Sequence, residues 1–119
     1  MSNIHTFNEL LMDFVKQLSV TYAHVPGMKM APNQLELLIK SYPKQPLEDF
    51  MNTVSPYVKK ITERDETFFL EDYNDIPFLK DIGFKSNWQK SPPETQSAIW
   101  EYMYNLMLLG GSIQALPEG

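Results

Sequence analysis

Few residues in this sequence have the types and spacing that catalysis or metal binding requires. The two histidines, His5 and His24, have no companion at the HxxxH or HxxE spacing of a metal site. The chain has no cysteine, which excludes a thiolate nucleophile, a disulfide and a cysteine-based zinc site. Ser55, Ser86 and Ser91 lie beside expected helix starts, where capping explains them, and no GxSxG sequence occurs. We therefore expect a protein that is not an enzyme and has no catalytic, metal-binding or cofactor-binding residues.

One acidic cluster remains as a candidate site, formed by Glu71, Asp72 and Asp75. Closely spaced carboxylates suit calcium, but this segment lacks the glycine and the closing glutamate of an EF-hand loop. A small enzyme that uses these acids is a third possibility, although paired carboxylates alone are too common to define a site. From Glu63 to Asp81 the chain has seven acids and two bases, a net charge of −5, and the rest is neutral. This segment is either a solvated acidic edge or a contact for a basic protein surface.

The overall charge and the hydropathy pattern exclude several other classes of partner. A neutral body with one acidic segment lacks the basic surface that supplies most nonspecific affinity for nucleic acid, so we expect no direct DNA or RNA binding. The most apolar window is twelve residues long and contains Glu101 and Asn105, which is too short for a membrane span. The N-terminus has no secretory pattern. We expect a soluble, intracellular protein with no membrane insertion.

The length of 119 residues fits a single domain, residues 1–119, with frayed ends at about 1–5 and 112–119. Apolar residues recur with the period of a helix, and no segment alternates as a strand does. A first helix is expected from Phe7 to Tyr22, with a capping box formed by Thr6 and Glu9. We predict an all-α fold, an irregular bundle of five to seven helices around a long, mostly buried C-terminal helix. Prolines restart the helices at Pro32, Pro46, Pro56, Pro77 and Pro92.

Three further expectations concern the segments between the first and last helices. The helix after Pro32 should bury Leu35, Leu38, Ile39 and Tyr42, and Asp65 or Thr62 should cap a short turn that carries Phe68. A short helix is expected between Asp75 and Gly83. Trp88 is expected in a polar segment that leads into the last helix.

The last expected helix, Ser91 to Gly110, has the clearest boundaries. Ser91 and Glu94 form a capping box, Pro92 fits the first helical position, and Gly110 should end the helix. Besides the face that includes Ile99 and Leu106, a second apolar face contains Trp100, Tyr104 and Met107. Either the preceding helices cover this second face, or it is partly exposed as a protein interface, for which aromatic residues are typical.

The ending SPPETQSAIWEYMYNLMLLG, with YVKKITERDETFFLE and IPFLKDIGF before it, resembles small helical proteins of nucleocytoplasmic large DNA viruses, including giant and algal viruses. The similarity covers about Met51 to Gly110, and its most specific elements are Ile99 and Trp100 with Tyr102, Leu106, Leu109 and Gly110. The resemblance implies no defined activity and transfers no functional residue.

Two functions are favoured over the small enzyme by these observations. The first is a nonenzymatic interaction or assembly protein in the virion, the virus factory or the host cytoplasm, whose partner is a second copy, a viral protein or a host protein. The alternative is an acidic regulator of viral replication or transcription, or of a host protein, which uses the acidic segment against a basic partner surface. Both assign the protein a protein partner, and an oligomer is compatible with either.

Overall fold

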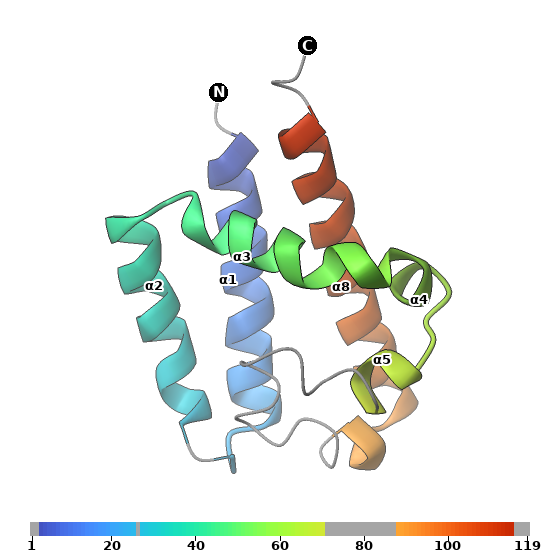
Figure 1. Ribbon diagram of the computed structural model, residues 1–119. Helices are drawn as coiled ribbons and strands as arrows, with labels where there is room; N and C mark the ends of the chain where they lie inside the picture. The colour runs from blue at the N-terminus through green and yellow to red at the C-terminus, as the bar shows by residue number, and fades with distance from the viewer. Residues whose placement is uncertain (1–2, 26, 71–87, 116–119) are drawn as a thin grey trace.

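The computed structural model describes residues 3–25, 27–70 and 88–115, and these are mostly helical, with no strand among them (Figure 1). The all-α class is therefore confirmed for this part of the chain. The expected helix between Asp75 and Gly83 lies outside the described residues, as do Glu71 and Asp72. The described elements, in chain order, are α1 (Asn3–Thr21), η1 (Met28–Met30), α2 (Ala31–Ser41), α3 (Gln45–Val54), η2 (Ser55–Tyr57), α4 (Val58–Thr62), α5 (Thr67–Leu70) and α8 (Pro93–Ala115).

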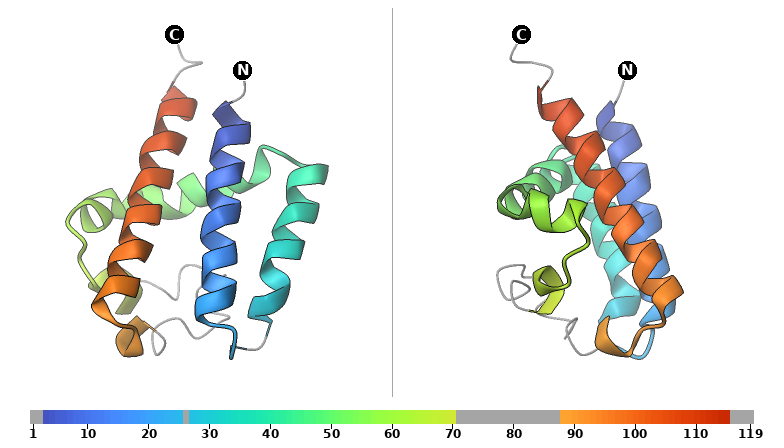
Figure 2. Two further views of the ribbon diagram at one scale, coloured as in Figure 1. Left: turned by 180° about the vertical axis from the view of Figure 1, so that it is seen from behind. Right: turned by 90° about the vertical axis from the view of Figure 1, so that its right-hand side faces the viewer.

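Three long helices, α2, α1 and α8, lie side by side, and α3, η2 and α4 cross one side of this layer (Figures 1 and 2). Helices α1 and α8 run antiparallel, so the start of α1 and the end of α8 lie near the same end of the described structure. Helix α8 contacts α1, α3 and α4, while α1 contacts α2, α3 and α8. Because α1 is as central as α8, the expected arrangement of the bundle around the last helix alone stays a prediction.

Local sequence explains where most of the short elements begin. Gly27 has a positive φ of 84°, which glycine adopts without strain and which turns the chain into η1. Pro32 and Pro46 lie in the first turns of α2 and α3, where a missing N–H costs no helical hydrogen bond. At Pro56 the α-helix gives way to the 3-10 turn η2, which confirms the expected break.

The core is built mainly from α1, α3 and α8, with additions from the short elements. The polar residue Asn8 of α1 is also buried in this core. Its Nδ2 donates a hydrogen bond of 3.0 Å to the carbonyl of Pro43, which links α1 to the connection between α2 and α3. Tyr42, expected to be buried, is exposed because it follows the last residue of α2 with a φ of −142° and so leaves the inward face. The most deeply buried side chains are Trp88, Phe7, Phe68, Met28, Ile61, Leu106 and Val54.

Both terminal helices are longer than the sequence pattern indicates. Helix α1 starts at Asn3, so Thr6 is inside it and does not form the expected cap. Helix α8 starts at Pro93 and continues through Gly110 to Ala115, so the expected glycine stop is wrong. Residues 3–5 and 112–115, expected to fray, belong to these helices.

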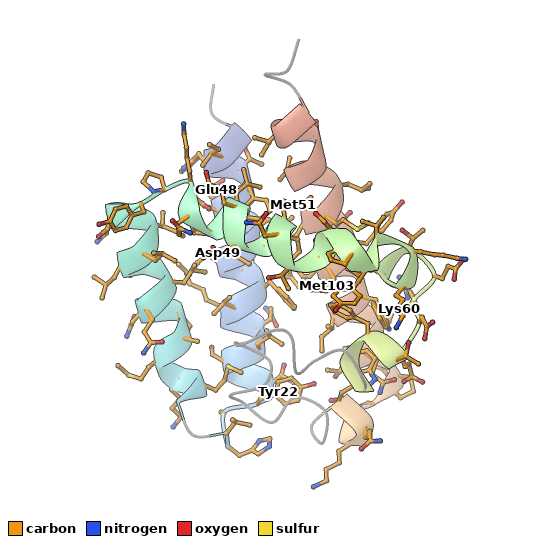
Figure 3. The ribbon with its side chains drawn as sticks, in the orientation of Figure 1. Tyr22, Glu48, Asp49, Met51, Lys60 and Met103 are labelled. Atoms are coloured by element: carbon orange, nitrogen blue, oxygen red, sulfur yellow. The ribbon has the colours of Figure 1, made fainter. Side chains whose placement is uncertain are left out.

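The physical reason for Gly110 is close packing. A Cβ atom at this position would lie 2.6 Å from Sδ of Met51 and 3.0 Å from Cδ1 of Leu47. Both of these residues belong to α3, and Figure 3 shows Met51 on α3 beside α8. Gly110 therefore allows α3 to approach α8 where any side chain would collide.

Candidate functional site

The expected interface on the last helix is only partly available on the surface. Trp100 and Met107 are 4% and 6% exposed, whereas Tyr104 is 39% exposed. Of the two alternatives for this face, coverage by the preceding elements therefore holds for Trp100 and Met107, which are not available as interface residues in the isolated chain. Tyr104 alone keeps the surface position that an interface requires.

Trp100 is buried because a second tryptophan packs against it. The rings of Trp88 and Trp100 meet edge to face, with centroids 5.5 Å apart and an interplanar angle of 83°. Trp88 is 1% exposed, which corrects its placement in a polar connection. Its Nε1 donates to Oε1 of Glu66 at 3.0 Å, and its carbonyl accepts from Nε2 of Gln96 at 2.8 Å. The polar residues around Trp88 in the sequence conceal this role, because its partners come from distant segments.

The exposed side of α8 carries an apolar pair that the sequence analysis did not single out. Leu108 is 51% exposed and lies one helical turn after Tyr104, so the two side chains are neighbours on one face. Glu101 and Asn105, the two polar residues within the most apolar window of the sequence, are exposed beside them. The signal in the sequence was the spacing of four residues between Tyr104 and Leu108. Only the packing of α8 shows that, within the row of Trp100, Tyr104 and Leu108, the last two side chains are exposed and Trp100 is buried.

A groove of about 360 Å³ follows the seam between α1 and α8. Phe14 and Tyr102 stack beside it, with ring centroids 5.0 Å apart and planes inclined by 19°. Leu18 of α1 and Ile99 of α8 extend the apolar surface, and Ala98 stands at the rim with its side chain exposed. The sequence patterns did not reveal this groove, because it forms only where two helices distant in sequence lie together.

Polar groups line the remainder of the groove, and they are mostly uncharged. They are Gln17 and Thr21 on α1, and Glu94 and Thr95 on α8. Glu94 is exposed and is the single charged residue among the lining residues. The groove therefore combines an apolar floor with a hydrogen-bonding rim and one negative charge.

Ser91 does not cap α8, which begins two residues later. Its Oγ instead forms a hydrogen bond of 2.6 Å with the hydroxyl of Tyr22, which joins the residue after α1 to the segment before α8. Burial raises the pKa of Tyr22 above 10.0, and the hydrogen bond to Ser91 opposes this shift. The pair fits a structural contact, since the phenol stays neutral at physiological pH.

Asp65 occupies the capping position that its sequence context indicates. Its Oδ1 accepts hydrogen bonds from the backbone N–H of Thr67 at 3.0 Å and from the Thr67 hydroxyl at 2.8 Å, at the start of α5. These bonds favour the carboxylate and lower the pKa of Asp65, with a smaller contribution from the charge of Lys60. The shifted pKa thus reports a helix cap, which confirms Asp65 in this role.

The remaining candidates do not come together in the described structure. His5 lies 3.2 Å from a carboxylate oxygen of Glu9 at the exposed start of α1, whereas the ring of His24 packs near Tyr22. Among residues 3–25, 27–70 and 88–115, no group of three His, Asp or Glu side chains is placed to hold a metal ion. The acidic cluster of Glu71, Asp72 and Asp75 lies outside these residues.

Two further observations complete this description. None of the described helices has the length and apolarity needed to cross a lipid bilayer. No protein-family model, no curated protein and no solved structure matches this chain.

Proposed function

We propose that this protein acts by binding another protein and catalyses no reaction of its own. The observation that carries the proposal is the exposed pair of Tyr104 and Leu108 on the outer face of α8. A tyrosine has a large apolar ring and a polar hydroxyl. It therefore suits an interface that is exposed to solvent before binding and partly buried afterwards. The pair lies on a helix of 23 residues whose other side is anchored in the core, so it is presented on a rigid support.

The setting of this interaction is also part of the proposal. The resemblance of Met51 to Gly110 to small helical proteins of large DNA viruses supports a role inside an infected cell, in the virion or the virus factory. The partner is then a second copy, a viral protein or a host protein. The alternative role as an acidic regulator depends on Glu71, Asp72 and Asp75, and no contact among the described residues favours it.

The test is affinity capture of the full chain from infected or native cells, followed by mass spectrometry. The Tyr104→Ala/Leu108→Ala variant should lose a partner that the wild-type protein retains. A matched control is Val20→Ala/Leu37→Ala, which removes two other exposed apolar side chains, 76% and 65% exposed, from α1 and α2. An identical partner list for wild type and both variants would refute the role of the Tyr104–Leu108 pair. Abundance of the protein in purified particles would support an assembly role.

A further inference from the structure

We infer that Ser91 is a phosphorylation site for a proline-directed protein kinase, and that its phosphate opens the contact between Ser91 and Tyr22. This modification goes beyond the proposed function and does not depend on the exposed pair of α8. Proline-directed kinases select a serine or threonine that precedes proline, because proline fits their pocket and has no N–H that would need an acceptor. The sequence has two such dipeptides, Ser55-Pro56 and Ser91-Pro92, and no threonine that precedes proline.

The structure distinguishes these two serines by their backbone. Ser55 has helical φ and ψ angles of −51° and −42°, and its Oγ donates a hydrogen bond to the carbonyl of Met51. A kinase binds its substrate as an extended segment, so phosphorylation of Ser55 would require α3 and η2 to unwind. Ser91 lies outside helical structure, between the helical residues 88–90 and the start of α8. Pro92 disfavours helical backbone at the residue before it, which suits the extended form.

The segment around Ser91 is also on the surface. Residues 89–90 and 92–94 are exposed, and Ser91 between them is half-buried. Trp88 is the buried anchor of this segment, and its carbonyl accepts a hydrogen bond of 3.1 Å from the N–H of Ser91. A kinase that extends the segment has to open this turn before α8, which is a smaller local unfolding than Ser55 requires.

The phosphoryl transfer uses the hydroxyl that contacts Tyr22 in the unmodified protein. In the kinase, Oγ of Ser91 attacks the γ-phosphorus of ATP, and the hydroxyl proton passes to a carboxylate of the kinase. A new O–P bond forms while the bond from the γ-phosphorus to the bridging oxygen breaks, so ADP leaves with the electron pair. The product has a phosphate on Ser91 with a charge of about −2 at neutral pH.

The surroundings of Tyr22 disfavour a phosphate where the Ser91 hydroxyl lies. Oγ of Ser91 is 2.6 Å from the hydroxyl of Tyr22, which follows α1 and is 3% exposed (Figure 3). The burial that raises the pKa of Tyr22 also penalises a negative charge beside it. Glu94, an exposed acid in the first turn of α8, repels the phosphate from the helix start, whereas the exposed Lys90 can pair with it in solvent. The phosphate therefore turns toward solvent and separates Ser91 from Tyr22.

Incubation of the full chain with a purified cyclin-dependent kinase and ATP tests the site, and mass spectrometry locates the phosphate. The phosphate should be found on Ser91 and not on Ser55. Ser91→Ala should abolish its incorporation, and Ser91→Thr, which keeps a hydroxyl before proline, should retain it. Ser55→Ala is the matched control and should leave the incorporation unchanged. Circular dichroism confirms that each variant is folded.

Urea unfolding tests the effect of the phosphate on the contact with Tyr22. The phosphorylated protein should unfold at a midpoint lower by about 0.5 M, the change expected for the loss of one hydrogen bond. In Tyr22→Phe, which lacks the hydroxyl, phosphorylation should leave the midpoint nearly unchanged. The inference is overturned if Ser91 takes no phosphate, if Ser55 is modified equally fast, or if the midpoint of the wild-type protein does not fall. An equal fall in Tyr22→Phe would also overturn it. Each of these results leaves the capture of a partner through Tyr104 and Leu108 unaffected.

Discussion

Replacing Gly110 by alanine sets helix propensity against packing at the contact between α8 and α3. In the interior of a helix, alanine is more favourable than glycine by about 0.5–1 kcal/mol. At Gly110, however, the added Cβ would lie 2.6 Å from Sδ of Met51, roughly 1 Å inside the ordinary separation of nonbonded heavy atoms. Displacing Met51 and Leu47 should cost about 1–3 kcal/mol, as overpacking of a core does. The variant should therefore be less stable than its helix propensity alone predicts.

Gly111 provides the matched control, because it is the next residue in the same helix. A Cβ atom there would meet Cε of Met51 at 4.0 Å, which is an ordinary contact. Gly111→Ala should thus gain about 0.5–1 kcal/mol, and the two variants should differ by about 1–3 kcal/mol. For a urea dependence of about 2 kcal/mol per molar, a difference of about 2 kcal/mol moves the unfolding midpoint by about 1 M.

The assay is urea unfolding of the wild-type protein and both alanine variants, followed by circular dichroism. A double-mutant cycle adds Met51→Ala, which alone should cost about 2–5 kcal/mol through the cavity it leaves. In the presence of Gly110→Ala this cost should be smaller by about 0.5–3 kcal/mol, since the new methyl group occupies part of the space. The explanation is refuted if Gly110→Ala is as stable as Gly111→Ala, or if the cycle shows no coupling.

Three further predictions test the buried and capping residues. Trp100→Ala should lower the unfolding free energy by about 3–5 kcal/mol, while Tyr104→Ala should change it by less than about 0.5 kcal/mol; equal losses in denaturant unfolding would place Tyr104 in the core as well. Burial raises the pKa of Tyr22, so the stabilisation by its neutral phenol is present below pH 10 and falls as the pH rises through the folded-state pKa. The stability of the wild-type protein relative to Tyr22→Phe should therefore decline in thermal melts at alkaline pH. A difference that stays constant with pH would contradict the raised pKa. The hydrogen bonds from Thr67 lower the pKa of Asp65, so the stabilisation of the fold by its carboxylate is present above the ordinary aspartate pKa. This stabilisation is lost as the pH falls through the folded-state pKa. Thermal melts from about pH 6 to pH 2 should show this loss in the wild-type protein and not in Asp65→Asn.

The features that could be predicted from sequence are those that depend on neighbouring residues. The restarts at Pro32 and Pro46 and the break at Pro56 follow from the missing N–H of proline and its effect on the preceding turn. Asp65 caps α5 because its carboxylate reaches the N–H two residues later, which is a local contact. The helical period likewise predicted the all-α class.

The candidate site depended on contacts between distant segments, and there the sequence patterns were insufficient. Trp100 and Tyr104 belong to the same row of an isolated helix, but Trp88 packs on the first and leaves the second exposed. Asn8 is a polar residue and carries no sequence signal of burial, yet it is buried, and the backbone carbonyl of Pro43 accepts its hydrogen bond. In each case the helical period indicates which residues share a face, but not which of them a distant segment covers.

The sequence by itself determined the helical class, the proline restarts and the lack of cysteine chemistry, because each depends on residue type or on groups within a few positions. Only the tertiary structure decided that Gly110 is a packing contact, that Tyr104 and Leu108 form the exposed apolar pair, and that α1 and α8 enclose a groove. The reason is that a side chain is buried only where another part of the chain packs against it. A helix with two apolar faces specifies that both require partners, whereas the packing of α1, α3, α4 and Trp88 against α8 determines which face obtains them within the chain.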